Sequence, residues 1–404
     1  MNFLRKRRGD YNSDSDNDDI NANKSKIHKS RKPPNTAFRQ QRLKAWQPIM
    51  TPKSVIPFLF VLACIFGPLG IGIIYTVANI EYLSIDYTHC ASKASSSFKA
   101  VPSSYVGHHF RSKNTSPEFK WRTDSAKDSF GDEISTCYIQ FNLPKDLKPP
   151  IYAYYHLTNF HQNHRKYVES YDLEQLKGIA VSAHDVDDNC SPLDFEGSGD
   201  DKKIIYPCGL IPNSYFNDSI SNLTLLNTKS TQDNETYVLS QTGISWSSDV
   251  KHKYKKTKYD PSDIVPPPNW YKMYPKGYTK SNIPDLQSWE LLQNWMRTAG
   301  LSSFYKLYGV NKTETLSSGT YETQIVLNYP VSIFHGTKSL VITTNSIFGG
   351  RNYALGVVYL VVAVLSLALA IAFLIQTIIK PRKVGEHDFL QGSTREPTNF
   401  REQL

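Results

Sequence analysis

The sequence predicts a membrane protein in which two transmembrane helices flank one large, mainly antiparallel β domain with helical insertions. Two uncharged apolar runs, Val55–Ala78 and Tyr353–Ile379, lie near opposite ends of the 404-residue chain. The first has 24 residues, about 36 Å as a helix, which exceeds a hydrocarbon core of roughly 30 Å. The segment between them contains short β-branched and aromatic stretches and most of the cysteines. We therefore expect strands, disulfides and N-glycans in that segment.

Charge predicts how the chain is oriented in the membrane. Residues 1–54 contain 13 Lys/Arg and five Asp, and three basic residues directly follow the second run: Lys380, Arg382 and Lys383. Positive flanks stay cytoplasmic, so both termini are expected in the cytosol and the middle outside it. The net charge of +9 resides in these ends, which favours contact with lipid headgroups over nucleic acid. The long basic leader favours a signal anchor over a cleaved signal peptide.

Composition then divides the chain into six parts. The first residues are dominated by Asp, Asn, Ser, Lys and Arg and contain little to bury, which is typical of disorder. From Pro33 onward, aromatic and basic residues alternate, a mixture suited to a membrane surface or a cytosolic partner. The predicted parts are a disordered cytosolic head (1–34), a cytosolic juxtamembrane segment (35–54), the first span (55–78), the glycosylated exoplasmic domain (79–352), the second span (353–379) and a cytosolic tail (380–404).

The cysteines support an oxidising compartment for the middle segment. Cys64 lies within the first span. An even number of four remains in the segment predicted to be exoplasmic, which indicates two disulfides with three possible pairings. These cysteines are Cys90, Cys137, Cys190 and Cys208.

Most glycosylation sequons lie on the same side. Six Asn-x-Ser/Thr triplets occur in the middle segment, of which Asn189 is set aside because a proline follows its serine, and one more, Asn23-Lys24-Ser25, lies in the predicted cytosolic head. One triplet would mean little, but five on the side already indicated by charge form a consistent pattern. The predicted glycosylation sites are Asn114, Asn217, Asn222, Asn234 and Asn311.

Local patterns predict the elements of the middle segment. Strands are expected where β-branched and aromatic residues cluster: Ile134–Leu143, Ile151–Leu157, Thr320–Leu327 and Leu340–Thr344. Helical patterns are fewer and cover Asn159–Tyr171 and Pro284–Arg297.

Candidate metal sites are incomplete. His161 and His164 have helical spacing, but zinc needs further ligands and the cysteines are expected in disulfides, so a polar helix face is favoured. A second stretch mimics a calcium loop, yet Cys190 replaces the required glycine and Pro192 interrupts it. The oxygen-bearing residues of that stretch are Asp185, Asp187, Asn189 and Glu196. With no recognisable catalytic motif either, we expect no metal, no cofactor and no catalytic residue.

Several segments together resemble a known family. They are Asn35–Pro52, Asn163–Ser170, Tyr206–Asp218, Pro266–Tyr274, Trp289–Gly300 and Phe348–Leu360. In this combination the chain resembles, from about Pro33 to Lys380, the non-catalytic β-subunit family of the type-IV P-type ATPases, the phospholipid flippases, in its fungal form. Pro212 departs from the small residue expected before Asn-Ser in the segment after Cys208.

The resemblance implies a heterodimer with a type-IV P-type ATPase that performs the catalysis. It implies that this chain serves assembly, export from the endoplasmic reticulum and activity of that ATPase in maintaining lipid asymmetry. It further implies the pairings Cys90–Cys137 and Cys190–Cys208, and location in the endoplasmic reticulum, the Golgi or endosomes, or the plasma membrane. The cytosolic segment is expected to contact the partner through Arg39, Arg42 and Trp46.

Two other classes of function stay open from the residues alone. A membrane-anchored exoplasmic enzyme would need a catalytic constellation that the sequence does not display. An adhesion or receptor protein would act without an ATPase. Neither class requires the motif-rich cytosolic segment before the first span, which therefore favours an accessory subunit.

Overall fold

The computed structural model of the protein describes residues 35–43, 50–111, 117–127, 130–186, 188–197, 202–226, 234–345 and 349–381. The predicted disordered head (1–34) and nearly all of the cytosolic tail lie outside these residues. Contacts divide the chain into two units, Met1–Val55 with Pro381–Leu404 and the much larger Ile56–Lys380. Each unit is described by itself.

The two predicted spans are long helices. Helix α1 covers Pro52–Ala78 and helix α7 covers Ala354–Ile379. Helix α1 begins three residues before its predicted start, and α7 begins one residue after its predicted start. Both are long and apolar enough to cross a membrane. Only a few of their residues are buried within the protein. Their remaining apolar surface is therefore available to lipid or to other helices.

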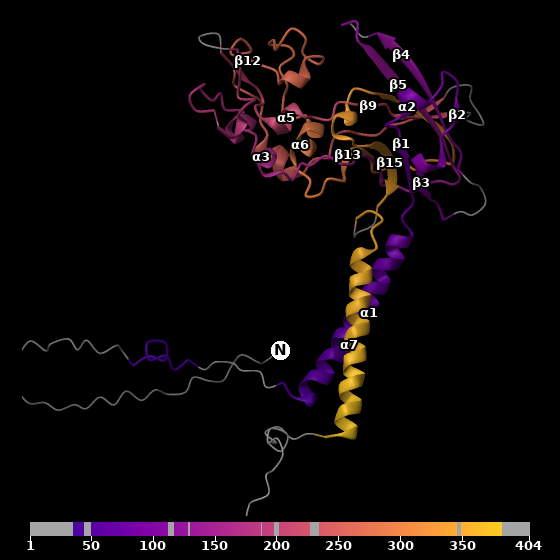
Figure 1. Ribbon diagram of the computed structural model, residues 1–404, viewed down its shortest axis with the longest axis vertical. Helices are drawn as coiled ribbons and strands as arrows, with labels where there is room; N and C mark the ends of the chain where they lie inside the picture. The colour runs from indigo at the N-terminus through magenta and orange to yellow at the C-terminus, as the bar shows by residue number, and fades with distance from the viewer. Residues whose placement is uncertain are drawn as a thin grey trace, which may run out of the picture. The chain divides into compact units, whose positions relative to one another are not determined.

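Small residues allow α1 and α7 to cross closely (Figure 1). A Cβ atom built on Gly70 would lie 2.9 Å from Leu360 Cγ and 3.0 Å from the carbonyl oxygen of Gly356. A Cβ atom on Gly356 would lie 2.7 Å from a side-chain carbon of Ile74. Next to this crossing, Phe66 stacks on Tyr359 with ring centroids 5.3 Å apart. Glycines at such crossings replace side-chain bulk with backbone contact, as is common between helices in lipid.

Among the described residues, the segment between α1 and α7 contains a five-stranded antiparallel sheet. Side chains on one face of β6 are buried and those on the other are half-buried, as expected for a sheet with one face on a core. Leu340 pairs with Tyr155 on one side and with Ile85 on the other, and all three are buried. In spatial order the strands are β13 (Phe304–Asn311), β6 (Ile151–Leu157), β15 (Lys338–Thr344), β1 (Tyr82–Asp86) and β3 (Val106–His109).

A second antiparallel sheet buries its inner face in the same core. Phe141 pairs with Tyr321 in register, their rings stack at 5.9 Å, and Phe119 pairs with Phe141 from the other side. Its strands in spatial order are β11 (Glu235–Tyr237), β10 (Leu223–Leu226), β14 (Gly319–Val326), β5 (Glu133–Leu143), β4 (Phe119–Lys127) and β2 (Lys99–Ala100), with β9 (Ser219–Ile220) beside β14.

A smaller sheet and short helices complete the domain. Strand β8 (Lys203–Ile205) pairs in parallel with β12 (Ile264–Val265) and antiparallel with β7 (Phe195–Glu196). The short helices are α2 (Cys90–Lys93), α3 (Arg165–Val168), α4 (Leu173–Leu176), α5 (Leu210–Asn213) and α6 (Glu290–Met296).

The helix predicted over Asn159–Tyr171 is wrong in extent, because only α3 is α-helical there. Asn159 has a positive φ of 57°, which no regular helix contains. Phe160 instead packs on Trp295 and Phe334, with centroid distances of 5.7 and 5.1 Å. Aromatic packing with distant residues therefore overrides the local pattern.

Candidate functional site

A buried ion pair organises the centre of the domain. Lys338 Nζ lies 2.7 Å from Asp218 Oδ2, and their side chains are 5 % and 0 % exposed. The hydroxyl of Tyr87 donates to the same oxygen at 3.1 Å, while Lys338 also donates to the carbonyl oxygen of Tyr329 at 2.8 Å. Burial, followed by the nearby Asp218 carboxylate, raises the pKa of Tyr87 well above its ordinary value. Tyr87 is therefore a neutral donor at every physiological pH.

The ion pair also fixes the connection between β14 and β15. Asp218 Oδ1 accepts hydrogen bonds from the backbone N–H groups of Asn328 and Tyr329, each at 2.7 Å. One carboxylate thus holds a cation, a phenol and two backbone donors. Such a satisfied buried charge restricts the local backbone to one arrangement, which positions the cavity wall that follows.

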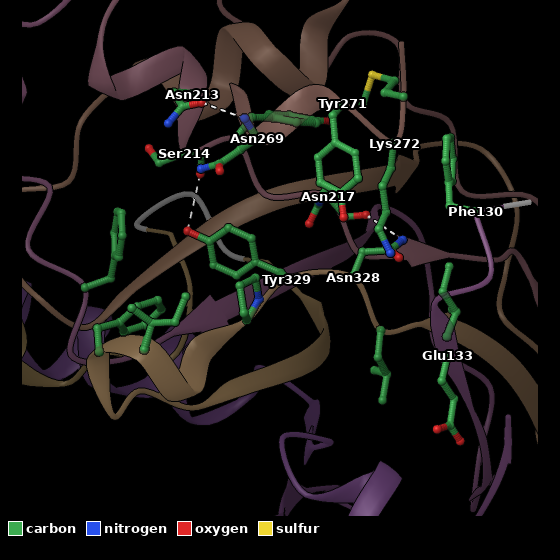
Figure 2. A pocket seen from close by; sticks show the side chains of 18 residues that line it. Phe130, Glu133, Asn213, Ser214, Asn217, Asn269, Tyr271, Lys272, Asn328 and Tyr329 are labelled. Carbon is green, nitrogen blue, oxygen red and sulfur yellow. Dashed lines mark hydrogen bonds between the residues drawn. The ribbon is translucent and has the colours of Figure 1, made fainter. Parts of the chain in front are cut away.

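This connection forms one wall of an open cavity of about 760 Å³. Figure 2 shows several chain segments converging on it, and hydrogen bonds join three of them. The N–H of Asn269 donates to Asn213 Oδ1 at 2.9 Å, and the amide of Asn328 donates to the carbonyl oxygen of Asn217 at 3.2 Å. The Tyr329 hydroxyl donates to the carbonyl oxygen of Ser214 at 3.3 Å. These three segments are the one after α5, the Pro266–Tyr274 stretch and the β14–β15 connection. They line the cavity together with Phe160 and with residues 130–134 at the start of β5.

The rim of the cavity, defined by four residues, is apolar and exposed. Ile333 is 78 % exposed, and the other three are exposed by 43 to 52 %: Phe130, Tyr271 and Met273. Beside the rim, Lys272 Nζ lies 2.9 Å from Asp132 Oδ2. Exposed aromatic and Met side chains grouped around a hollow are typical of a protein-binding surface. Amide groups in the walls suit the backbone of an incoming loop, whereas the described residues that line the cavity include no nucleophile arranged with a base.

The predicted cysteines form two disulfides, in the pairing that the resemblance implies. Cys90–Cys137 has a Cα–Cα distance of 6.0 Å and joins the segment after β1 in one sheet to β5 in the other. Cys190–Cys208, at 5.5 Å, joins segments beside the small sheet. All four residues are fully buried. The first bridge therefore ties the two large sheets together, and the second closes a local loop.

The predicted glycosylation sites differ in exposure. Asn222 and Asn234 are exposed, Asn217 is half-buried in the cavity wall, and Asn311 is 8 % exposed. The amide nitrogen of Asn311 donates to the carbonyl oxygen of Val238 at 3.0 Å and to Glu314 Oε2 at 2.9 Å. Asn114 lies outside the described residues. All five stay predictions, and geometry favours Asn222 and Asn234.

The predicted cytosolic contact residues are partly described. Residues 37–41 form a turn, in which the Arg39 N–H donates to Thr36 Oγ1 at 3.2 Å. The Arg42 guanidinium donates to Asn35 Oδ1. Both arginines are exposed, and Trp46 lies outside the described residues. Their role in partner contact stays a prediction.

Metal ligands do not converge within the described part of the chain, where no group of three or more His, Cys, Asp or Glu side chains could hold an ion. His161 and His164 flank the start of α3 and are exposed. Asp187 of the calcium-like stretch lies outside the described residues.

The cavity and the ion pair were missed by sequence reasoning. Their residues come from several distant segments, and no local pattern links Asp218 to Lys338. The one available signal was that Tyr206–Asp218 and Pro266–Tyr274, quoted for the resemblance, both reach the cavity.

Comparison with known proteins decides the family. The model of the LEM3 (ligand-effect modulator 3) / CDC50 family matches residues 73–383. This chain belongs to that family. The chain is 50 % identical over 371 residues to the phospholipid-transporting ATPase accessory subunit CRF1 of Saccharomyces cerevisiae, covering 91 % of each chain. It is 39 % identical to the accessory subunit CDC50 of Chaetomium thermophilum, covering 96 % of each. It is also 33 % identical to cell cycle control protein 50A of Mus musculus, covering 86 % of this chain and 89 % of the relative.

Membership in the CDC50/LEM3 family, together with the two apolar helices, makes the chain a membrane protein. The match spans the β domain, its disulfides, the cavity and α7. The features on which the site rests are thus within the part of the chain that the family shares.

Proposed function

We propose that this chain is the non-catalytic accessory subunit of a phospholipid-transporting P-type ATPase and forms a heterodimer with it. The observation that carries the proposal is the identity of 50 % across 91 % of both chains with a relative named as such a subunit. Two further relatives bear the same kind of name at 39 and 40 % identity. The apolar helices, with their largely outward side chains, supply surface for packing beside a larger membrane protein.

The exoplasmic cavity is the proposed docking site for an exoplasmic loop of the ATPase. Its exposed rim provides apolar contact, and the asparagines in its walls provide hydrogen bonds to a backbone. Asn217 lies in that wall, so a glycan on Asn217 would compete with docking. Glycosylation of Asn217, which stays a prediction, and docking into this cavity therefore exclude each other.

Both termini are proposed to be cytosolic, with the β domain exoplasmic and glycosylated. The basic residues that flank the apolar helices and the two disulfides support this orientation. Endoglycosidase should lower the apparent mass of the full chain. An unchanged mass, together with digestion of the β domain by protease added to sealed microsomes, would mean that the β domain is cytosolic and the proposed orientation is wrong.

In the cytosol, the segment 35–54 is proposed to stabilise particular conformations of the ATPase. A subunit shifts a conformational equilibrium only by its difference in affinity for the two states. Replacing Arg39, Arg42 and Trp46 together by alanine should leave the disulfides intact and change the ATP turnover of the purified complex. Identical turnover and identical complex yield would remove this segment from the mechanism.

The direct test of the heterodimer is purification of the full chain in a mild detergent. We expect one large membrane ATPase to co-purify in a stable ratio, and the rim variant Ile333→Asp to lower its yield. Tyr271→Phe, which keeps the apolar ring, is the matched control. Recovery of the chain without any ATPase would overturn the proposal and favour an adhesion or receptor role.

A further inference from the structure

A second cavity lies where the five-stranded sheet meets the start of α7. It has a volume of about 760 Å³, within the range of roughly 300–1,000 Å³ typical of small-molecule sites. Its lining includes three tyrosines from three strands, Tyr82, Tyr154 and Tyr305, together with Arg351. None of these residues belongs to the docking cavity described above. It is therefore a separate site.

Strand geometry gathers the tyrosines on the outer face of the sheet. In β6, Ala153 and Tyr155 face the core, so Tyr154 points to the opposite face. Tyr305 is 57 % exposed. Burial raises the pKa of Tyr154 and of Tyr305, so both rings stay neutral. Neutral phenol rings present electron-rich faces, which attract alkylammonium groups.

Arg351 supplies the positive charge. Its Nε and Nη2 donate to the Tyr353 hydroxyl at 3.1 and 3.0 Å, and its guanidinium lies 5.6 Å from the centroid of the Tyr82 ring. Within the described part of the chain, no carboxylate pairs with Arg351. The nearby Glu81 is already paired with Lys145 and accepts from the Arg111 N–H at 3.2 Å. Of the five guanidinium donors, those not bonded to Tyr353 can bind a phosphate.

The place of the cavity in the chain identifies the source of such a phosphate. Arg351 and Tyr353 directly precede Ala354, where the uncharged helix α7 begins. Residues at that point lie at the level of the lipid headgroups. A phosphate and an alkylammonium group next to each other form the headgroup of a zwitterionic phospholipid.

We propose that this cavity binds the headgroup of a zwitterionic phospholipid of the exoplasmic leaflet, with its phosphate on Arg351 and its ammonium group among Tyr82, Tyr154 and Tyr305. The inference depends on α7 spanning the membrane and on the proposed exoplasmic side of the β domain, and it needs no ATPase. Its failure would leave the proposed function untouched.

The test uses the full chain in a sugar-based detergent that contains no phosphate, purified both alone and with its co-purifying ATPase. The probe is phosphatidylcholine with a photoactivatable group on the choline, and labelled peptides are mapped by mass spectrometry. We expect labelling in β6, in β13 or at residues 349–353. Short-chain phosphatidylcholine should compete with the probe, and diacylglycerol should not.

Variants separate recognition from simple anchoring. Arg351→Gln should lower labelling roughly tenfold, because a charge-assisted pair is lost. Tyr305→Leu should lower labelling several-fold, whereas Tyr305→Phe keeps the ring face and should label normally. Arg111→Gln, which removes an exposed arginine bonded to Asn79 beyond the end of α1, is the charge-matched control. Complex yield measured in the same samples reports folding and heterodimer formation independently.

Three results would overturn the proposal. Equal labelling of Arg351→Gln and the wild type would make Arg351 an interfacial anchor only. Equal labelling of the cavity by a diacylglycerol probe would mean that no headgroup is recognised. Labelling of the chain alone that disappears when the ATPase is bound would assign the cavity to the protein partner.

Discussion

The β domain and the membrane helices are stabilised in opposite ways. The domain is stabilised by contacts within itself, namely a continuous buried core, two disulfides and a buried ion pair. In α1 and α7, by contrast, the buried residues are few and mostly small. In lipid, apolar burial provides no driving force between helices, so shape decides which helices associate. The difference indicates that the domain folds on its own contacts while the helices provide surface for the ATPase.

The largest predicted effect tests the self-sufficiency of the domain. Asp218→Asn leaves Lys338 buried without its counter-ion, and we expect the free energy of unfolding to fall by about 3–5 kcal/mol. Urea unfolding of the full chain in detergent, followed by tryptophan fluorescence, measures it. Glu118→Gln breaks the exposed pair with Lys120 and should cost less than about 1 kcal/mol. Equal effects of the two variants would contradict a central role for the buried pair.

The contribution of each disulfide to the free energy of unfolding should increase with the length of chain that it closes. In the chain-entropy relation, the 47-residue separation of Cys90–Cys137 corresponds to about 4 kcal/mol. The 18-residue separation of Cys190–Cys208 corresponds to about 3 kcal/mol. Cys90→Ser should therefore impair complex yield and export more than Cys190→Ser, and Cys64→Ser, in α1, should impair neither. Normal export of Cys90→Ser would argue against a structural role for the bridge between the sheets.

A substitution that separates α1 from α7 should leave the stability of the β domain unchanged. A leucine at position 70 meets Leu360 and the Gly356 backbone, so Gly70→Leu should separate α1 from α7 and lower ATPase yield several-fold. Gly72→Leu is the matched control, because a Cβ atom on Gly72 meets nothing within 4 Å. Urea unfolding of the domain should be unchanged in both. A domain destabilised by Gly70→Leu would mean that the two regions are coupled.

A pH-dependent effect concerns Lys306 of the β domain, whose Nζ donates to the Asn294 carbonyl oxygen at 2.9 Å. Burial, assisted by Arg297, lowers the pKa of Lys306 to about 8. Between that value and its ordinary pKa near 10.5, the unfolded chain binds more protons than the folded one. The free energy of unfolding should therefore rise with pH in that window, by at most about 1.4 kcal/mol per unit. Lys306→Met should flatten this rise, and a slope unchanged in the variant would assign it to other groups.

Sequence patterns were sufficient where local chemistry decides the structure. The lengths of the apolar runs predicted α1 and α7, and clustered β-branched and aromatic residues predicted β5, β6, β14 and β15 to within two residues. Strand β13 was not predicted from the sequence, because Lys306 and Gly309 interrupt its apolar pattern. Strand β13 is stabilised by pairing with β6 and by packing on α6. These contacts cannot be deduced from the sequence of β13 alone.

The sites were less predictable because each is assembled from distant segments. Asp218 and Lys338 are 120 positions apart in the sequence, and the tyrosines of the second cavity come from three strands. The sequons illustrate the same limit, because Asn222 and Asn311 look alike as triplets while only Asn222 is exposed. Tertiary packing, which single-sequence patterns do not encode, decides each of these cases.

The central claim, a non-catalytic subunit on which an ATPase depends, is tested most directly by reconstitution. The co-purifying ATPase and this chain are placed in vesicles separately and together, and ATP hydrolysis and movement of a fluorescent phospholipid are measured at equal ATPase content. We predict no activity from the chain alone, little from the ATPase alone, and full activity from the pair. ATP hydrolysis by the chain alone, or equal lipid movement by the ATPase with and without it, would contradict the account.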